Sequence, residues 1–372
     1  MRLLYESFEI MNLISKKNVP TGGAAVEWYN WLKGFKKIGC EVGILTWKGS
    51  NAEIKEKEFD YDLVESYDLN KGIPKLRLFY YRIPSYYKAI KSYNPDFLLE
   101  GCATENTGIM AFLSKVTGKP FIHRIGSDMD VDGRIARNFS KLSLAVYYYG
   151  LKNADHISCQ NKYQYEILKR KYPNKSISIL YNSIEIKKPF NKNVEKEYIA
   201  WVGNFRYEKN LPAVAEIVKK LSCYKFKIAG TRFSTTDEDA KRGLDELENL
   251  ENVEFVGHLT NIEIRDFLSN AYCLLNTSRL EGFSNTFLEA WSVGIPVVTT
   301  INVNPDNIIK EHNLGIVAED YESLPKIINE LISSKDYLDF GERCFKYVSE
   351  KHNPEILATQ FLNDMKSCKK VF

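Results

Sequence analysis

The chain has 372 residues, of which 44% are hydrophobic and 27% are charged, and its net charge is +3 at pH 7. This composition is that of an ordinary globular protein, and the length predicts about two domains. No apolar run approaches the roughly 20 residues of a transmembrane helix, and acids interrupt the amino-terminal stretch where a signal peptide needs an apolar core.

The charge is unevenly distributed along the chain. Residues 1–194 carry 30 basic and 20 acidic side chains, whereas residues 195–372 carry 21 and 28. The basic first half favours an anionic partner such as a phospholipid surface, although a solvated lysine-rich surface explains it equally well. The seven cysteines include no Cys-x-x-Cys pair, which predicts reduced thiols, no zinc site and a cytoplasmic protein.

Short apolar runs alternate with amphipathic stretches through the first half. A helix is expected over 22–39, where Ala25, Trp28, Tyr29, Leu32 and Phe35 share one face. Strands are expected at 2–7, 41–47, 95–101, 119–126, 154–160 and 176–182. Strands separated by helices predict a parallel sheet covered on both faces.

The stretch 184–197 lacks periodicity and is rich in Lys and Asn, which is typical of a linker. The alternation then restarts, with helices expected over 211–222 and 285–294 and strands at 198–204, 224–230, 252–258, 271–278 and 295–300. The predicted fold class is therefore α/β, with two Rossmann-like, doubly wound domains. Ligands of such sheets bind beyond the carboxyl ends of the strands.

The segment "RLEGFSNTFLEAWSVGIPVVTT" (279–300) contains two glutamates eight positions apart. A strand ends before Glu281, and a helix then begins near Asn285 and Thr286. The first N–H groups of that helix could bind a phosphate. Glu289, one turn further, could accept hydrogen bonds from a ribose diol. Glu281 would then face a sugar attached to the phosphate.

A second segment, "WVGNFRYEKNLP" (201–212), places cations after a strand. Arg206 and Lys209 could neutralise the charge that grows on a departing diphosphate. The alternative is a solvated loop with ordinary surface cations.

The pattern "EGFSNTFLEA", continued by "GIPVV", resembles the E-x(7)-E motif of the retaining family 4 glycosyltransferases (glycosyl transferases group 1), which have the GT-B fold. The resemblance implies two domains facing a central cleft, a nucleotide-diphosphate sugar as co-substrate, and no cofactor or catalytic metal. It also implies a front-face reaction in which the leaving phosphate takes the proton of the acceptor. The first domain (1–194 with the carboxyl-terminal helix 352–372) would bind the acceptor, and the second (195–351) the donor.

The resemblance also assigns roles to single residues. Glu281, Lys209 and Arg206 would be catalytic, although Asn204 stands where the family usually has Arg. The expected donor-binding residues are Gly22, Gly23, Asn204, Gly257, His258, Gly282, Phe283, Ser284, Asn285, Thr286 and Glu289. Gly22 and Gly23 are not part of a G-x-G-x-x-G motif, which argues against a dehydrogenase.

The segment "HRIGSDMDVDGR" (123–134) alternates three aspartates in the manner of a calcium loop. Phe139 stands where that loop needs its twelfth-position glutamate, so an EF-hand is rejected. Ile125 occupies the place of a histidine common in the family, and His123 is expected to belong to the strand, in the core or at the edge. Arg124 and Asp128 are expected to contact the acceptor.

The segment 75–93 interleaves Arg77, Arg82, Lys88 and Lys91 with six aromatic residues. It could lie on an anionic membrane surface, or it could be a buried aromatic helix with a charged outer face. No RNA-binding motif accompanies it, so no nucleic-acid partner is expected.

The predicted function is transfer of a sugar to a saccharide or a lipid-linked glycan in cell-surface polysaccharide assembly, in the cytoplasm or at the inner membrane face. Two alternatives remain. One is a non-catalytic protein that binds sugar nucleotides or polyanions, and the other is a GT-B sugar-nucleotide epimerase.

Overall fold

The computed structural model describes residues 1–16, 22–55, 57, 60–74, 76–186, 190–232, 236–260 and 263–369. Val19–Thr21 of the expected Gly-Gly loop and Lys187–Pro189 of the expected linker lie outside these ranges. The chain forms two compact units: unit 1 comprises Met1–Ser183 and Pro354–Phe372, and unit 2 comprises Ile184–Asn353. The sequence placed these boundaries at 194/195 and 351/352.

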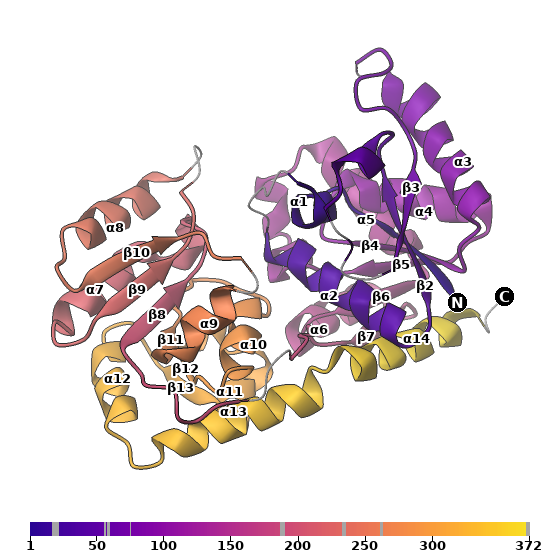
Figure 1. Ribbon diagram of the computed structural model, residues 1–372. Coiled ribbons are helices and arrows are strands. Elements are labelled where there is room, and N and C mark those ends of the chain that lie inside the picture. Colours follow the sequence, from indigo (N-terminus) through magenta and orange to yellow (C-terminus); the bar gives the residue numbers. More distant parts are fainter. Residues whose placement is uncertain are drawn as a thin grey trace. The chain divides into compact units, whose positions relative to one another are not determined.

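Within the described residues, unit 1 contains a parallel sheet of seven strands in the order β3-β2-β1-β4-β5-β6-β7 (Figure 1). The strands are β1 (Arg2–Glu6), β2 (Glu41–Thr46), β3 (Asp62–Glu65), β4 (Phe97–Gly101), β5 (Phe121–Arg124), β6 (His156–Cys159) and β7 (Ser176–Ile179). All but β3 were expected. Its sequence, Asp-Leu-Val-Glu, is short, half-buried and at the edge of the sheet, so it lacks the long apolar run of a central strand.

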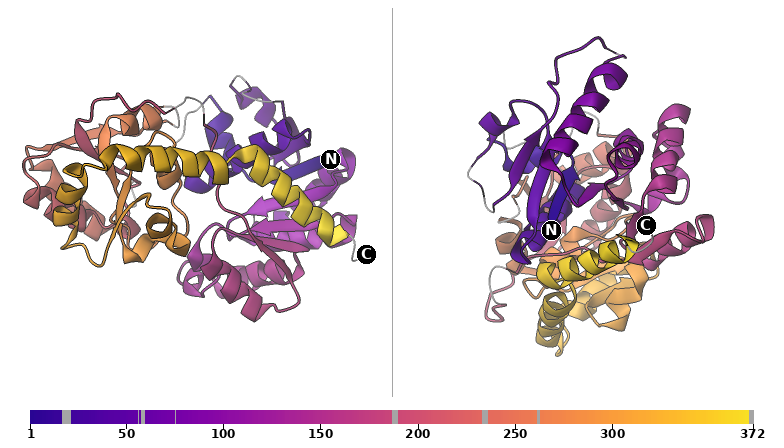
Figure 2. Two further views of the ribbon diagram at one scale, coloured as in Figure 1. Left: turned by 90° about the horizontal axis from the view of Figure 1, so that it is seen from below. Right: turned by 90° about the vertical axis from the view of Figure 1, so that its right-hand side faces the viewer.

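Helices cover both faces of this sheet and bury separate cores. One core joins the sheet to helices α1 (Ile10–Ile14), α2 (Gly23–Lys37) and α14 (Pro354–Lys369). The other joins it to α3 (Ile83–Tyr93), α4 (Glu105–Thr117), α5 (Lys141–Asn153) and α6 (Lys162–Lys171). Figure 2 shows α14, in yellow, running along unit 1, where it packs on α2. The last helix therefore belongs to unit 1.

The described part of unit 2 contains a parallel sheet of six strands in the order β10-β9-β8-β11-β12-β13. The strands are β8 (Tyr198–Val202), β9 (Phe226–Ala229), β10 (Val253–Gly257), β11 (Ala271–Leu275), β12 (Val297–Thr300) and β13 (Gly315–Ala318). The helices are α7 (Leu211–Lys220), α8 (Glu238–Glu248), α9 (Glu263–Ser269), α10 (Asn285–Trp291), α11 (Ile308–Glu311), α12 (Leu324–Ile332) and α13 (Tyr337–Lys351). Only β13 was not predicted among these strands.

Two parallel α/β sheets with helices on their faces confirm the predicted fold class. Every described cysteine side chain is a free thiol. Among the helices in the described ranges, none is both long and apolar enough to cross a bilayer.

Candidate functional site

The centre of the unit 2 sheet is a point where the strand order reverses. From β8 the chain first builds outward through β9 and β10, and it then returns to add β11, β12 and β13 on the other side. The loops that follow β8 and β11 therefore diverge from neighbouring strands at the carboxyl edge. Such a reversal opens a crevice, which is where open α/β sheets bind ligands.

An ion pair joins these two loops. Lys209 is the last residue of the short helix η5 (Tyr207–Lys209) after β8, and its Nζ lies 2.8 Å from Oε1 of Glu281 in the loop after β11. The Nδ2 group of Asn276 donates to Oε2 of Glu281 at 3.3 Å. The side chains of Lys209 and Glu281 are 21% and 19% exposed, so both remain reachable by a ligand.

The surroundings of Glu281 hold it in its anionic form. Burial by itself would raise the pKa of Glu281, but the charge and hydrogen bond of Lys209 outweigh burial. Hydrogen bonds from Asn276 and Ser284 act in the same direction, and the pKa falls below its usual value. The site therefore presents a preorganised cation and anion side by side at neutral pH.

Backbone contacts fix the position of Lys209. The hydroxyl of Thr277 donates to the carbonyl of Lys209 at 2.8 Å, and Nε1 of Trp201 donates to that hydroxyl at 3.2 Å. Thr277 follows β11 and Trp201 lies within β8, so the two strands hold the lysine between them. This chain of bonds keeps the lysine in place without using its ammonium group.

Arg279, which the sequence did not single out, binds the η5 loop to the β11 loop. Its guanidinium donates to the carbonyl of Tyr207, to Oδ1 of Asn210 at 2.7 Å and to Oδ2 of Asp239 at 2.7 Å. Its backbone N–H donates to the carbonyl of Glu208 at 2.8 Å. Only the tertiary fold brings these residues together, since they are separated by 40 or more positions.

The predicted donor-binding run continues from Glu281 into α10. Gly282, Phe283 and Ser284 are buried, while Asn285 and Thr286 are half-buried at the start of the helix. The hydroxyls of Ser284 and Thr286 lie 2.8 Å apart. The helix has seven residues, fewer than the ten expected for 285–294. Phosphate binding at its start stays a prediction.

Glu289 projects from the same helix, and its side chain is half-buried. Burial raises its pKa to about 7, and the positive charge of Arg265 on α9 opposes that rise. Arg265 is a second residue that the sequence did not suggest, because it lies on a different helix. The carboxylate therefore changes its charge near neutral pH, and the arginine biases it toward the anion.

The other predicted site residues of unit 2 lie along the same edge of its sheet. Asn204 is half-buried between β8 and η5, and Arg206 is exposed just before η5. Gly257 and His258 are exposed at the end of β10, two strands from β8. Gly257 has a φ of 76°, which favours glycine. Their contact with a nucleotide stays a prediction.

The unit 1 sheet reverses its order between β1 and β4, and a pocket of about 160 Å³ lies at that point. Glu6 and Glu100, at the ends of these two strands, are register partners, and Glu100 is in register with His123 of β5. The row points toward the face covered by α3, α4 and α5. The pocket is lined by Tyr5, Glu6, Ser7, Phe8, Glu9, Ala24, Ala25, Glu100, Gly101, Cys102, Thr104 and Asn106.

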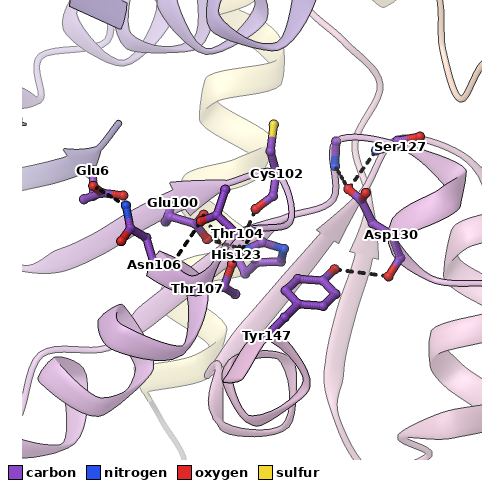
Figure 3. A network of polar contacts seen from close by, with 11 residues as sticks. Glu6, Glu100, Cys102, Thr104, Asn106, Thr107, His123, Ser127, Asp130 and Tyr147 are labelled. Carbon is purple, nitrogen blue, oxygen red and sulfur yellow. Dashed lines mark hydrogen bonds and ion pairs between the residues drawn. The ribbon is translucent and has the colours of Figure 1, made fainter. Parts of the chain in front are cut away.

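Figure 3 shows the polar network around this row. Glu6 accepts hydrogen bonds on Oε1 from the Asn106 side chain at 2.9 Å and from the Tyr86 hydroxyl at 3.1 Å. Oε2 of Glu100 lies 2.6 Å from Nδ1 of His123. Burial, reinforced by the charge of Glu100, raises the pKa of Glu6 to about 8. The sequence could not suggest this pair, whose members are far apart in the chain.

The Gly-Gly motif begins α2, and its two residues are exposed. Ala24 and Ala25, which directly follow Gly22 and Gly23, line the pocket of unit 1. The motif thus opens the helix beside the reversal point of the first sheet. Its contact with a donor stays a prediction.

Arg124 is enclosed in the core of unit 1 and is 1% exposed. Its guanidinium donates to Glu27 of α2 at 2.5 Å, and the remaining acceptors are Oγ of Ser158, the carbonyl of Leu180 and Oδ1 of Asn182, each at 2.9 Å. It also lies over the ring of Trp31. In this conformation the guanidinium has no surface for an acceptor, and its contacts are those of a structural residue.

The three aspartates of 123–134 take separate partners. Oδ1 of Asp128 accepts from the side chains of Asn161 and Gln164, Asp130 accepts from the backbone N–H groups of Gly126 and Ser127, and Asp132 pairs with Arg134. Within the described residues no group of three or more His, Cys, Asp and Glu could hold a metal ion. His123 is fully buried, as expected. The acceptor contact of Asp128 stays a prediction.

Comparison with known proteins covers both units. Residues 21–188 match the family model "Glycosyltransferase Family 4", and residues 182–348 match "Glycosyl transferases group 1". The chain is 24% identical over 301 residues to an uncharacterized glycosyltransferase of Methanocaldococcus jannaschii, covering 76% of this chain and 82% of the relative.

Two solved structures share the fold. Sucrose-phosphate synthase from Thermosynechococcus elongatus superposes with a TM-score of 0.77 at 16% identity and covers 100% of both chains. Anabaena HepE in complex with UDP-glucose superposes with a TM-score of 0.74 at 13% identity, covering 99% of this chain and 100% of HepE.

Proposed function

The chain belongs to the group 1 glycosyltransferases of family 4, which are retaining GT-B enzymes that use nucleotide sugars, and we propose that unit 2 binds the donor and unit 1 the acceptor. The observation that carries this assignment is the Lys209–Glu281 pair at the strand-order reversal of the unit 2 sheet. A cation fixed beside an anion, with both side chains partly exposed, suits a ligand that has a diphosphate at one end and a hydroxyl-rich sugar at the other.

In this proposal Lys209 neutralises the charge that develops on the leaving diphosphate, with Arg206 as a second cation. Electrostatic stabilisation of developing charge by a preorganised group is commonly the largest catalytic contribution. The backbone of the η5 loop is held by the Thr277 hydroxyl and by the N–H of Arg279, and the ammonium lies against Glu281, so little reorganisation is needed when the bond to the sugar breaks.

Glu281 is proposed to orient the sugar through hydrogen bonds from its hydroxyls, helped by the amides of Gly282, Phe283 and Ser284. Its lowered pKa supports this role, because an ionised carboxylate is an acceptor only. Asn285 and Thr286 would contact the phosphates, Glu289 the ribose, and Gly257 and His258 the base. Asn204, Gly22 and Gly23 would complete the donor contacts.

We further propose a UDP-hexose as donor, on the similarity to HepE, whose structure was solved with UDP-glucose. The acceptor is proposed to be a saccharide or a lipid-linked glycan with a free hydroxyl, bound in the pocket of unit 1. The hydrogen-bonding groups of that pocket support a polyhydroxylated ligand, because Glu6, whose pKa is raised to about 8, and the side chains of Thr104 and Asn106 both donate and accept.

A donor screen tests the assignment. Thermal shift with UDP-, GDP- and ADP-sugars identifies the base, and nucleotide release from the stabilising donor then measures turnover. We expect stabilisation by a UDP-sugar and slow release of UDP without acceptor. Binding without release or transfer would indicate a non-catalytic binding protein, and conversion of the donor to an epimer would indicate an epimerase. Either result would contradict the proposal.

A further inference from the structure

The turn that leads into α3 exposes large apolar side chains. Leu69, Ile73, Leu76, Phe79 and Tyr80 are 37%, 63%, 58%, 70% and 54% exposed. We call the segment that carries them, residues 69–74 and 76–80, the apical turn. In Figure 1 it lies at the top of unit 1, above α3. One expectation for residues 75–93 was a buried aromatic helix with a charged outer face. Helix α3 fits this expectation, because its Tyr86 and Ile90 are buried, but the apical turn does not, because its apolar side chains are exposed.

The apical turn is folded rather than merely exposed. The backbone N–H of Ile73 donates to the Tyr80 hydroxyl at 2.5 Å, and that of Asp68 donates to the Tyr81 hydroxyl at 2.9 Å. Arg77 donates from its guanidinium to the carbonyl of Leu69 at 3.0 Å and from its backbone to the carbonyl of Ile73 at 2.8 Å. The polar groups therefore bind one another, and the apolar side chains point outward.

The surface next to this turn is basic. Residues 69–93 contain six lysines and arginines and no acidic residue. Helices α3, α4 and α5 cover the same face of the sheet, and across them Glu105 is the only acid. The exposed cations on these three helices are Lys88, Lys91, Lys115, Lys141 and Lys152. Exposed apolar residues lie among them: Phe112, Val116, Leu142 and Tyr149.

We propose that the apical turn and the outer faces of α3, α4 and α5 form a surface that docks on an anionic phospholipid bilayer. Ile73, Leu76 and Phe79 would enter the boundary between head groups and acyl chains, while Lys88 and Lys91 contact the lipid phosphates. Apolar side chains flanked by cations are the composition that binds this interface, because burial and attraction to anionic lipids act together. The cation–π contact of Lys91 with Tyr87 keeps its charge at the surface.

The same observations argue against two other occupants. A second copy of this chain would bring another basic surface, with Glu105 as the only acid on its three helices, to a two-fold interface where like charges repel. A single-stranded nucleic acid binds through stacking on aromatic faces, whereas three of the five exposed residues of the apical turn, Leu69, Ile73 and Leu76, are aliphatic. A bilayer satisfies both the charge and the apolar side chains.

Vesicle co-sedimentation of the full chain tests the proposal. One set of vesicles is pure phosphatidylcholine, and the other contains about 30 mol% phosphatidylglycerol. We expect binding to the anionic vesicles to be at least about tenfold stronger, and to weaken as salt is raised because the Debye length shortens. Absence of binding to the anionic vesicles at low salt would overturn the proposal.

Matched variants separate this surface from the rest of the chain. Ile73→Ser with Phe79→Ser should lower the partition coefficient about tenfold or more, because two exposed apolar side chains no longer insert. Leu338→Ser, at a residue of α13 that is 57% exposed, is the apolar control and should bind as wild type.

Lys88→Ala with Lys91→Ala should weaken binding about tenfold at low salt. The charge-matched control is Lys326→Ala with Lys335→Ala. Equal loss in variant and control would overturn the assignment of the surface.

Two further measurements exclude trivial explanations. Nucleotide release from a soluble donor should be unchanged in the docking variants, which shows that they fold, whereas vesicle binding is measured without a donor and does not depend on the donor assignment. Phe79→Trp should gain fluorescence quenching by brominated phospholipids, relative to Leu338→Trp. If wild type is instead a dimer in size-exclusion chromatography with light scattering, and Ile73→Ser with Phe79→Ser makes it monomeric, the surface joins copies of the chain and the proposal fails.

Discussion

The two sheets reverse their strand order in the same way, but the two reversal points carry opposite electrostatics. In unit 2 a lysine and a glutamate lie 2.8 Å apart and each side chain is about one-fifth exposed. In unit 1 two glutamates are register partners, and they are 2% and 1% exposed. The first arrangement offers both charges to a ligand, whereas in the second burial and the charge of Glu100 raise the pKa of Glu6 to about 8. A shared fold thus provides the location of each site, while the residues at the strand ends decide which ligand chemistry suits it.

A similar contrast holds for the ion pairs of the two units. Arg124–Glu27 in unit 1 is 1% and 4% exposed, and the guanidinium donates four hydrogen bonds. Lys209–Glu281 remains reachable. Removing one partner of a buried ion pair is costly, because the other charge is left in the protein interior without a partner. Partial exposure instead leaves both charges available to a ligand. The following predictions use this difference.

The largest expected effect is on the stability of unit 1. Arg124→Met should lower the free energy of unfolding by about 3 to 5 kcal/mol, because it leaves the Glu27 carboxylate buried without its partner. Urea unfolding measures the loss, and hydrogen exchange should show it in β5, β6 and α2. Lys209→Ala is the comparison and should cost about 1 kcal/mol or less. If Arg124→Met is instead as stable as wild type but no longer uses the acceptor, the result would support the predicted contact of Arg124 with the acceptor.

The next effect is on turnover. Lys209→Ala and Glu281→Gln should each lower kcat by about 10² or more, from loss of a preorganised charge contact. Steady-state nucleotide release measures this, and the double variant should be less impaired than the product of the two, because the groups act as a pair. Lys219→Ala removes an equally short pair with Glu246 on the exposed surface and should leave kcat unchanged. Near wild-type rates for both site variants would refute the assignment.

The sequence predicted the strands and the donor motif because both are local. Apolar runs indicate central parallel strands. Glu281 and Glu289 lie on one loop and on the helix that follows it. The missed strands, β3 and β13, are four residues long and lie at sheet edges, where burial demands less of the sequence. The partners Glu6–Glu100, Arg279–Asp239 and Arg265–Glu289 depend on strand register and helix packing. One sequence without its fold cannot indicate these pairs.

A third prediction concerns the acidic pair of unit 1. The pKa of Glu6 is raised to about 8 in the folded chain, above its usual value, so the folded state binds an extra proton between about pH 4.5 and 8. The free energy of unfolding should therefore fall as pH rises through this range, by about 1 to 3 kcal/mol. Glu6→Gln should flatten this dependence, since its oxygen can still accept from Tyr86 and Asn106. Urea unfolding at several pH values measures it.

Glu254→Gln, at an exposed carboxylate in unit 2, is the control for Glu6→Gln and should leave the pH dependence of wild type unchanged. A slope that persists in Glu6→Gln would mean that another group titrates. If wild type instead becomes more stable toward pH 8, Glu6 is ionised in the fold and the pocket of unit 1 is charged. The contrast between the two reversal points would then be lost.

The smallest expected effect tests whether charge matters at the ribose end of the donor. The pKa of Glu289 is raised to about 7 by burial, so its carboxylate is protonated below that pH and accepts diol hydrogen bonds less well. The KM for the donor should rise severalfold from pH 8 to pH 6, with little change in kcat, because binding rather than chemistry is affected.

Arg265→Gln removes the charge that favours the anion and should move this transition to higher pH. Arg242→Gln, on the exposed face of α8, should not. A transition that stays in place in Arg265→Gln would separate the arginine from the carboxylate, and a pH-independent KM would remove Glu289 from the donor contacts altogether.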